Sequence, residues 1–168
     1  MKNISKIIIP LISLILIISC GAYGFSGVNV GEAKTVQINY FPNQAPLVEP
    51  SLSNRFTQEL QDLFVQQTNL ELTDKNADLI FEGEITDYRI NPMSATAEQT
   101  AAQNRLTISV NVRFTNRLEE KDSFEKQFSF YSDFPANSQL VGGVLDAALE
   151  EILERITQDI FNASVAKW

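Results

Sequence analysis

The strongest constraint on the fold is a ten-residue stretch that alternates between apolar and polar side chains without a break. Its apolar members are Leu106, Ile108, Val110, Val112 and Phe114. The polar residues between them are Thr107, Ser109, Asn111, Arg113 and Thr115. Successive side chains of a strand point to opposite faces, so this pattern predicts a strand of an antiparallel sheet with one buried and one polar face.

Residues 123–133, which are rich in Phe and Tyr, predict the partner of this strand. If the apolar faces match, paired residues add up to 238 in number, which puts Phe114 opposite Phe124. The same register places Arg113 beside Glu125 on the polar face, where opposite charges are favourable. We therefore expect an antiparallel hairpin in this register.

The second long strand is expected at 78–90. The alternation puts Leu79, Phe81 and Ile85 on the apolar face, and Gly83 falls in the same series. A glycine there indicates a bulge or a close backbone approach. The opposite, polar face should carry Glu82, Glu84, Thr86 and Tyr88.

Other segments complete the predicted architecture. Alternation favours strands at 34–41 and 70–72, and apolar residues three and four positions apart predict amphipathic helices at 52–67 and 140–163. Residues 92–103 are polar, small and non-periodic, which predicts a loop. Two such helices can cover one face of a four- or five-stranded mixed sheet. The fold class is therefore two-layer α+β, with the other sheet face polar and open.

The N-terminus has the features of a bacterial secretory signal. Lys2 and Lys6 flank the start of a mostly apolar run at 7–18, which is shorter than the roughly 20 residues that cross a bilayer. Ile17-Ile18-Ser19-Cys20 resembles the lipobox of bacterial lipoproteins, and Cys20 is the only cysteine in the chain. The alternative is an ordinary secretory peptide, or a short signal anchor, with a chance cysteine.

The lipobox resemblance implies a division of the chain into three parts. Residues 1–19 are expected to be a signal peptide, 20–33 a tether lipidated at Cys20, and 34–168 a single domain. Several acyl chains make a stable anchor where one would not. The tether begins without acidic residues, and bacterial sorting habits then imply the outer membrane, with the domain facing the periplasm.

Composition excludes several functions. The chain has no histidine, so hydrolases with an imidazole base and most zinc sites are improbable, and we expect neither a metal nor a cofactor. Without Lys2 and Lys6 the balance is 11 basic against 21 acidic residues, which disfavours nucleic acid. Glu82 and Glu84 share a strand face and could in principle perform acid–base chemistry, but such neighbours are usually solvated. We expect no enzyme activity.

Four segments together resemble the lipopolysaccharide-assembly lipoprotein family, LptE. The segments are Cys20-Gly21 with Tyr23 and Phe25, Ile38–Asn43, Phe81–Thr86 with Tyr88, and Asn104–Ile108 with Val112–Phe114. The resemblance covers nearly the whole chain after Cys20. It implies a plug inside the lumen of a large outer-membrane β-barrel, LptD, that helps the barrel fold and helps deliver lipopolysaccharide to the outer leaflet.

The polar sheet face is the expected contact with the barrel. Its candidate residues are Thr107, Ser109, Asn111 and Arg113. The resemblance also implies lipopolysaccharide binding by basic side chains, and the local candidates are Arg113, Arg117, Lys121 and Lys126. These alternate with acidic residues, so a salt-bridged turn is the competing interpretation. A lipoprotein subunit of another envelope lipid-transport machine is the alternative function.

Overall fold

The predicted hairpin is present in the predicted register. The computed structural model describes residues 30–93 and 102–165, so Cys20 and the expected signal peptide lie outside it. Strands β4 (Gln103–Asn116) and β5 (Phe124–Pro135) pair antiparallel, with Phe114 opposite Phe124 and Arg113 opposite Glu125. Matching apolar faces were therefore sufficient to predict this pairing.

Three further strands complete a mixed sheet in the order β2-β1-β3-β4-β5. Strand β1 (Thr35–Ile38) pairs in parallel with β2 (Glu71–Leu72) and with β3 (Leu79–Met93). β3 pairs antiparallel with β4 as far as Met93 and Gln103, so both strands reach into the predicted loop 92–103. Of the remaining residues of that predicted loop, 94–101 lie outside the described residues.

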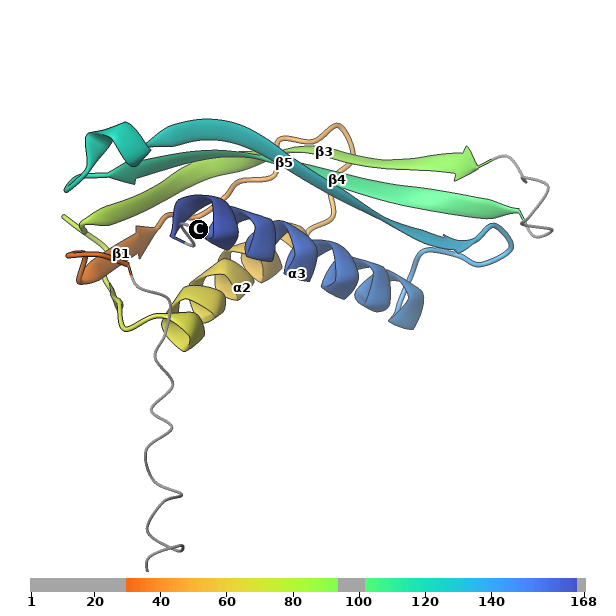
Figure 1. The fold of residues 1–168 in the computed structure, drawn as a ribbon. Coiled ribbons are helices and arrows are strands. Elements are labelled where there is room, and N and C mark those ends of the chain that lie inside the picture. The colour runs from red at the N-terminus through yellow and green to blue at the C-terminus, as the bar shows by residue number, and fades with distance from the viewer. Residues whose placement is uncertain (1–29, 94–101, 166–168) are drawn as a thin grey trace, which may run out of the picture.

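Both helices lie on one face of the sheet, which confirms the two-layer α+β prediction (Figure 1). Helix α2 spans Leu52–Gln67, as predicted. Helix α3 spans Gly143–Ser164 and begins three residues later than expected (143 against 140), after the Gly142 N-cap at φ 54°. Among the described residues, no helix is long and apolar enough to cross a bilayer.

A row of aromatic side chains ties the two layers together. Phe64 on α2 packs against Phe81 on β3 at 4.8 Å between ring centroids and against Phe161 on α3 at 5.0 Å. Phe81 continues to Phe114, also at 4.8 Å, and Phe114 reaches Phe124 on β5 at 5.3 Å. Such tilted pairs are favourable beyond their area burial. The core therefore runs from both helices across three strands.

The predicted face of Tyr88 is wrong. The register of β3 against β4 shifts between Ile85 and Asp87, so Thr86 is an extra residue in the strand. After this bulge the alternation is reversed, and Tyr88 pairs with Ile108 on the helix-covered face, where it is 7% exposed. Burial, and secondarily the charge of Glu49, raises the pKa of the Tyr88 phenol.

Gly83 marks a close backbone approach, one of the two expectations for this glycine. It pairs regularly with Val112, and the bulge lies three residues further on, at Thr86. A Cβ at position 83 would overlap the backbone oxygen of Asn111 and would lie 2.7 Å from Cε1 of Phe41. Only a residue without a side chain fits between β4 and the segment that follows β1.

Asp78 holds the start of β1 against β3. Its Oδ2 atom accepts hydrogen bonds from the backbone N–H groups of Lys34 (2.9 Å) and Thr35 (3.1 Å) and from the Thr35 hydroxyl (3.0 Å). These bonds, first of all the one from the Lys34 N–H, lower the pKa of the Asp78 carboxyl. One carboxylate thus fixes a strand that is 43 residues away in sequence.

Candidate partner-binding face

The outer face of the sheet, turned away from α2 and α3, carries the predicted partner-facing residues. Thr107, Ser109, Asn111 and Arg113 alternate along β4 with residues that are buried under the helices. Neighbouring side chains come from β3 and β5, because each β4 residue is paired on both sides. The outer face is consequently three strands wide along most of β4.

The centre of the outer face is a network of hydroxyl and amide groups. The Ser109 hydroxyl donates to Oγ of Ser129 at 2.9 Å, and Ser129 donates to the Ile108 carbonyl at 3.1 Å. The Gln127 amide donates to the Thr86 hydroxyl at 3.1 Å. Ser109 is only 6% exposed, less than its predicted place on an open face suggested. Short neighbouring side chains, which are hydrogen-bonded to one another, shield the Ser109 side chain from solvent.

The end of the outer face nearest the β4–β5 turn is charged and internally paired. The Asn111 amide donates to Oε1 of Glu125 at 3.0 Å, and Arg113 Nε donates to Oε2 of the same residue at 3.4 Å. Arg113 also lies 3.8 Å from Glu82. The bond from Asn111, followed by the charge of Arg113, lowers the pKa of the Glu125 carboxyl.

The opposite end of the outer face carries a second fixed pair. Arg105 donates two hydrogen bonds to Asp133, from Nε at 2.7 Å and from Nη2 at 2.8 Å. The guanidinium also lies over the ring of Tyr131, 3.6 Å from its centroid. The bidentate bond lowers the pKa of Asp133 and raises that of Arg105. Planar groups held in this way present a preformed polar surface to a partner.

The four basic candidates for lipopolysaccharide binding do not share one face of the sheet. Lys126 pairs with buried Val112 on the helix side, and its Nζ lies 5.0 Å from the ring centroid of Phe128. Arg113 lies on the outer face, and Lys121 pairs with Glu119 at 3.3 Å in the turn. Arg117 is exposed beside the same turn. Lipopolysaccharide binding by these residues stays a prediction.

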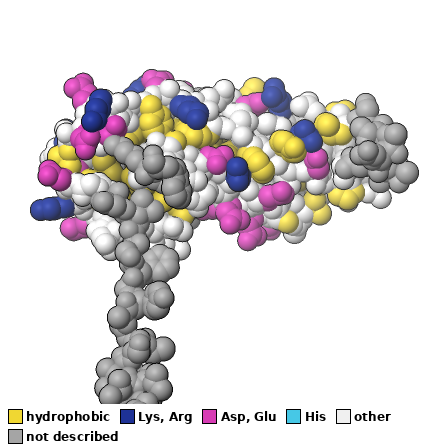
Figure 2. Space-filling model, in the orientation of Figure 1, with side chains coloured by type: hydrophobic (Ala, Val, Ile, Leu, Met, Phe, Trp, Pro, Cys, Tyr) yellow, Lys and Arg dark blue, Asp and Glu magenta, His cyan; other side chains and the backbone are white. Residues whose placement is uncertain are grey.

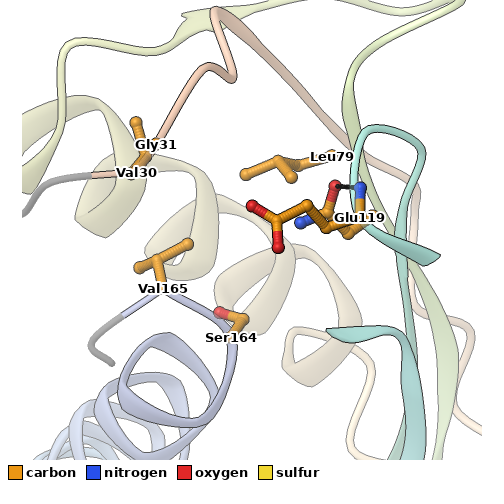
Figure 3. Close-up of a pocket in the computed structure, with 7 residues that line it drawn as sticks. Val30, Gly31, Leu79, Glu119, Ser164 and Val165 are labelled. Carbon is orange, nitrogen blue, oxygen red and sulfur yellow. Dashed lines mark hydrogen bonds between the residues drawn. The ribbon is translucent and has the colours of Figure 1, made fainter. Parts of the chain in front are cut away.

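A cavity of about 290 Å³ lies between the segment that precedes β1 and the C-terminal end of α3. Val30, Leu79 and Val165 form apolar parts of its lining, and Figure 3 shows the Glu119 carboxylate pointing into it. Lys121 pairs with this carboxylate. The Ser164 hydroxyl donates back to helix carbonyls, to Ile160 at 2.8 Å. The Glu119 carboxylate and the Ser164 hydroxyl are thus each engaged with a partner outside the cavity lining.

The paired carboxylates Glu82 and Glu84 are placed like surface acids. Asn39 donates its amide to Oε1 of Glu82 at 2.9 Å, and Arg113 lies near the other oxygen. Glu84 is exposed. Neither residue lines the cavity beside Glu119, so this pair is not enclosed there in the way that carboxylate chemistry would require.

A different carboxylate, Glu59 on α2, is strongly perturbed. It faces α3, and burial raises its pKa from the ordinary 4.5 to about 7, helped by the charges of Glu154 and Glu150 and opposed by Arg55. A folded-state pKa above the unfolded value means that the folded state binds the proton more tightly. The resulting stability is complete below about pH 4.5 and is lost as the pH rises through about 7.

Glu59→Gln is therefore expected to stabilise the domain at pH 8 and to leave it unchanged at pH 4. The gain should be about 1–2 kcal/mol after allowing for solvent screening, seen as a rise of a few degrees in Tm. Thermal unfolding followed by circular dichroism across this pH range measures it. Glu71→Gln, which removes an exposed charge on β2, is the control. Equal curves for the two variants would contradict the assignment.

Comparison with known proteins identifies the family. A family model described as LptE, Lipopolysaccharide-assembly, matches residues 33–164. The chain belongs to this family. LptE proteins are non-enzymatic lipoproteins of the bacterial envelope, and lipopolysaccharide assembly is accordingly the broad functional class of this chain. The family resemblance predicted from the sequence segments is confirmed.

One of the two solved structures compared below, that of CT253, shares the fold at low sequence identity. The hypothetical protein CT253 from Chlamydia trachomatis superposes with a TM-score of 0.54 at 11% identity, over 80% of this chain and 99% of that one. Rare lipoprotein B from Shewanella oneidensis gives 0.41 at 11% identity, over 76% and 89% of the two chains. No curated protein gives a significant sequence match.

Proposed function

We propose that this LptE-family chain is an outer-membrane lipoprotein that plugs an LptD-type β-barrel, helps it fold and assists delivery of lipopolysaccharide to the outer leaflet. The family match over residues 33–164 is the observation that carries the proposal. The domain, 34–168, would face the periplasm and the barrel lumen. It would be held by acyl chains on Cys20 after removal of residues 1–19.

The outer face of the sheet has the physical character that a plug needs. The lumen of a large outer-membrane barrel is polar and water-filled. A plug must therefore offer hydrogen-bonding groups that keep their positions, since mobile side chains would lose entropy on docking. Glu125 and Asp133 are each fixed by an arginine, and Ser109 by Ser129. These fixed groups support docking of this face against the barrel wall.

A plug binds its barrel through many weak contacts spread over a wide surface. No single hydrogen bond between neutral groups is worth more than about 0.5–1.5 kcal/mol net. Alanine at Thr107, Ser109 or Asn111, one at a time, should therefore change complex formation little. Catalysis is not part of the proposed role.

Depletion of the chain in its own bacterium tests the proposed role. We expect the amounts of folded barrel and of surface lipopolysaccharide to fall together, and the natural chain, supplied again, to restore both. Cys20→Ala, supplied in its place, should incorporate no clickable fatty acid. Heat-modifiable mobility of the barrel, lipopolysaccharide accessible at the cell surface and metabolic labelling are the three measurements.

The outcomes separate this role from its alternative. If barrel folding and surface lipopolysaccharide both persist while another lipid pathway fails, the chain is a subunit of a different transport machine. Persistent fatty-acid labelling of Cys20→Ala would refute the lipid anchor at Cys20 and would leave the proposed plug role unaffected.

A further inference from the structure

Strand β5 forms one edge of the sheet, and within the described residues no strand pairs with its outer side. It is twelve residues long, with proline only at its last position, Pro135. Long edge strands expose a row of backbone N–H and C=O groups to which another strand can bond. Edges of this kind are usually shortened, bulged or interrupted by proline.

The hydrogen-bond pattern shows which residues of β5 offer these groups. In the 238 register the Ala136 N–H donates to the Ala102 carbonyl at 3.0 Å. Hydrogen-bonded and non-hydrogen-bonded pairs alternate along antiparallel strands. The even-numbered residues of β5 therefore bond to β4, and the backbone groups of its odd-numbered residues point away from the sheet, at the free edge. The backbone N–H and C=O groups at this free edge therefore include those of Gln127, Ser129 and Tyr131. Pro135, which lacks an N–H, is also odd-numbered.

A hollow of about 310 Å³ lies beside this edge on the helix side, between β5 and α3. Phe130 contributes its partly exposed ring, and Glu151, Glu154, Arg155 and Gln158 contribute the helix wall. A strand added to β5 would place every second side chain on this side of the sheet. The side chain level with Phe130 would then enter the hollow.

Charges along the helix side of β5 favour a particular side-chain pattern. Arg155 is paired with Asp159 at 3.4 Å, and its guanidinium lies 5.7 Å from the centroid of the Phe130 ring. Ser132 donates a hydrogen bond to Glu151. The lining of the hollow thus carries two carboxylates, Glu151 and Glu154, against one arginine whose charge Asp159 balances. Figure 2 shows acidic side chains along the strip that α3 occupies in Figure 1. Lys126, four residues before Phe130 on the same side of β5, provides a positive charge whose Nζ lies 5.0 Å from the centroid of the intervening Phe128 ring.

We propose that β5 and the hollow beside α3 form a docking site for an extended segment of a partner protein. The segment adds antiparallel to β5, the more stable pairing per residue. On its helix-facing side it carries Lys or Arg level with Phe130 and, four residues later, Asp or Glu level with Lys126. The backbone edge supplies affinity and the two charges set the register. This site is separate from the outer face and does not depend on the plug role.

A synthetic peptide tests the site on the full chain in mild detergent. The probe is acetyl-Thr-Val-Thr-Lys-Thr-Val-Thr-Asp-Thr-Val-amide, in which every helix-facing position is Val, Lys or Asp. We expect the peptide to slow hydrogen exchange at the outward N–H groups of Gln127, Ser129 and Tyr131 by tenfold or more. Exchange at Lys126, Phe128 and Phe130, already bonded to β4, should change little. Nuclear magnetic resonance reads both sets of residues.

Two controls test the charge pattern. A peptide of the same composition, with Lys alone moved by one residue to the other side of the strand, cannot place both charges beside the helix in any register and should bind at least tenfold more weakly. Glu154→Lys should weaken the first peptide by a similar factor, whereas Glu150→Lys, on the same helix but outside the hollow, should not. Unchanged exchange at the three outward N–H groups with about 1 mM peptide, or equal binding of both peptides, would overturn the proposal.

Discussion

Replacing Gly83 by alanine should lower the free energy of unfolding by about 3 kcal/mol or more. The added methyl group would overlap the Asn111 backbone oxygen, which belongs to the β4 ladder and cannot rotate away. On its other side it would press on the Phe41 ring, which is fully buried. Overpacking of a well-packed core ordinarily costs about 1–3 kcal/mol, and a fixed backbone obstacle lies at the upper end.

Gly143→Ala is the matched control for this substitution. A Cβ at Gly143 would meet no atom within 4 Å, and the residue lies at the start of α3. Alanine there should be neutral or should stabilise by about 0.4–1 kcal/mol. Thermal unfolding should separate the two variants by roughly 10 °C. A Gly83→Ala domain with the natural Tm would mean that β3 and β4 are not pressed together at this point.

Two aspartates on the outer face, Thr107→Asp with Asn111→Asp, should prevent the proposed complex with the barrel. Burial of a charge without a partner of its own costs several kcal/mol per ion, so two would exceed what a polar interface recovers. An aspartate at 107 would face Arg89, but that arginine is already paired with Asp87 at 3.2 Å. Position 107 is preferable to 109 because Ser109 is already buried in the isolated domain. An aspartate at 111 also loses the amide bond to Glu125 and adds a like charge beside it.

Co-purification from membranes in mild detergent measures this effect. The double variant should retain less than a tenth of the barrel that accompanies the natural chain. Thr107→Ser with Asn111→Gln, which keeps both positions neutral, should retain most of it. Thermal unfolding of the isolated variants must show that both remain folded. If the aspartate variant keeps its barrel, another surface of the domain makes the contact.

Sequence patterns were sufficient for most of the fold, because burial of one face imposes a strict period. The alternation at 106–115 and its match to 123–133 predicted the register of β4 and β5. The first and last residues of α2 were also predicted correctly. The bulge at Thr86 was invisible because Thr86 and Asp87 are both polar. An extra residue in a polar pair leaves no mark in the hydropathy, and Tyr88 was therefore assigned to the wrong face.

The candidate site was less predictable than the fold. Alternation placed Thr107 to Arg113 on one face but could not show that Ser129 would close over Ser109. Lys126 and Arg113 were both assigned to one basic cluster because they lie near the same end of the hairpin. In the pairing of β4 with β5, however, Arg113 lies opposite Glu125 and Lys126 lies opposite Val112, so the two side chains point to opposite faces of the sheet. Glu59 gave no sequence signal, because its surroundings come from α3, almost a hundred residues later.

The Asp78 contact also has a mechanical consequence. If the chain is anchored at Cys20 as proposed, a pull on the domain arrives at the start of β1, where Asp78 binds Lys34 and Thr35. β1 is bonded in parallel on both sides, to β2 and to β3, so a pull along the strand loads many bonds at once. Lys34 and Thr35 bear this force first, and their hydrogen bonds to Asp78 carry part of it. A domain anchored in this way would resist traction between the membrane and a bound partner, because the bonds of its attachment strand would have to break together.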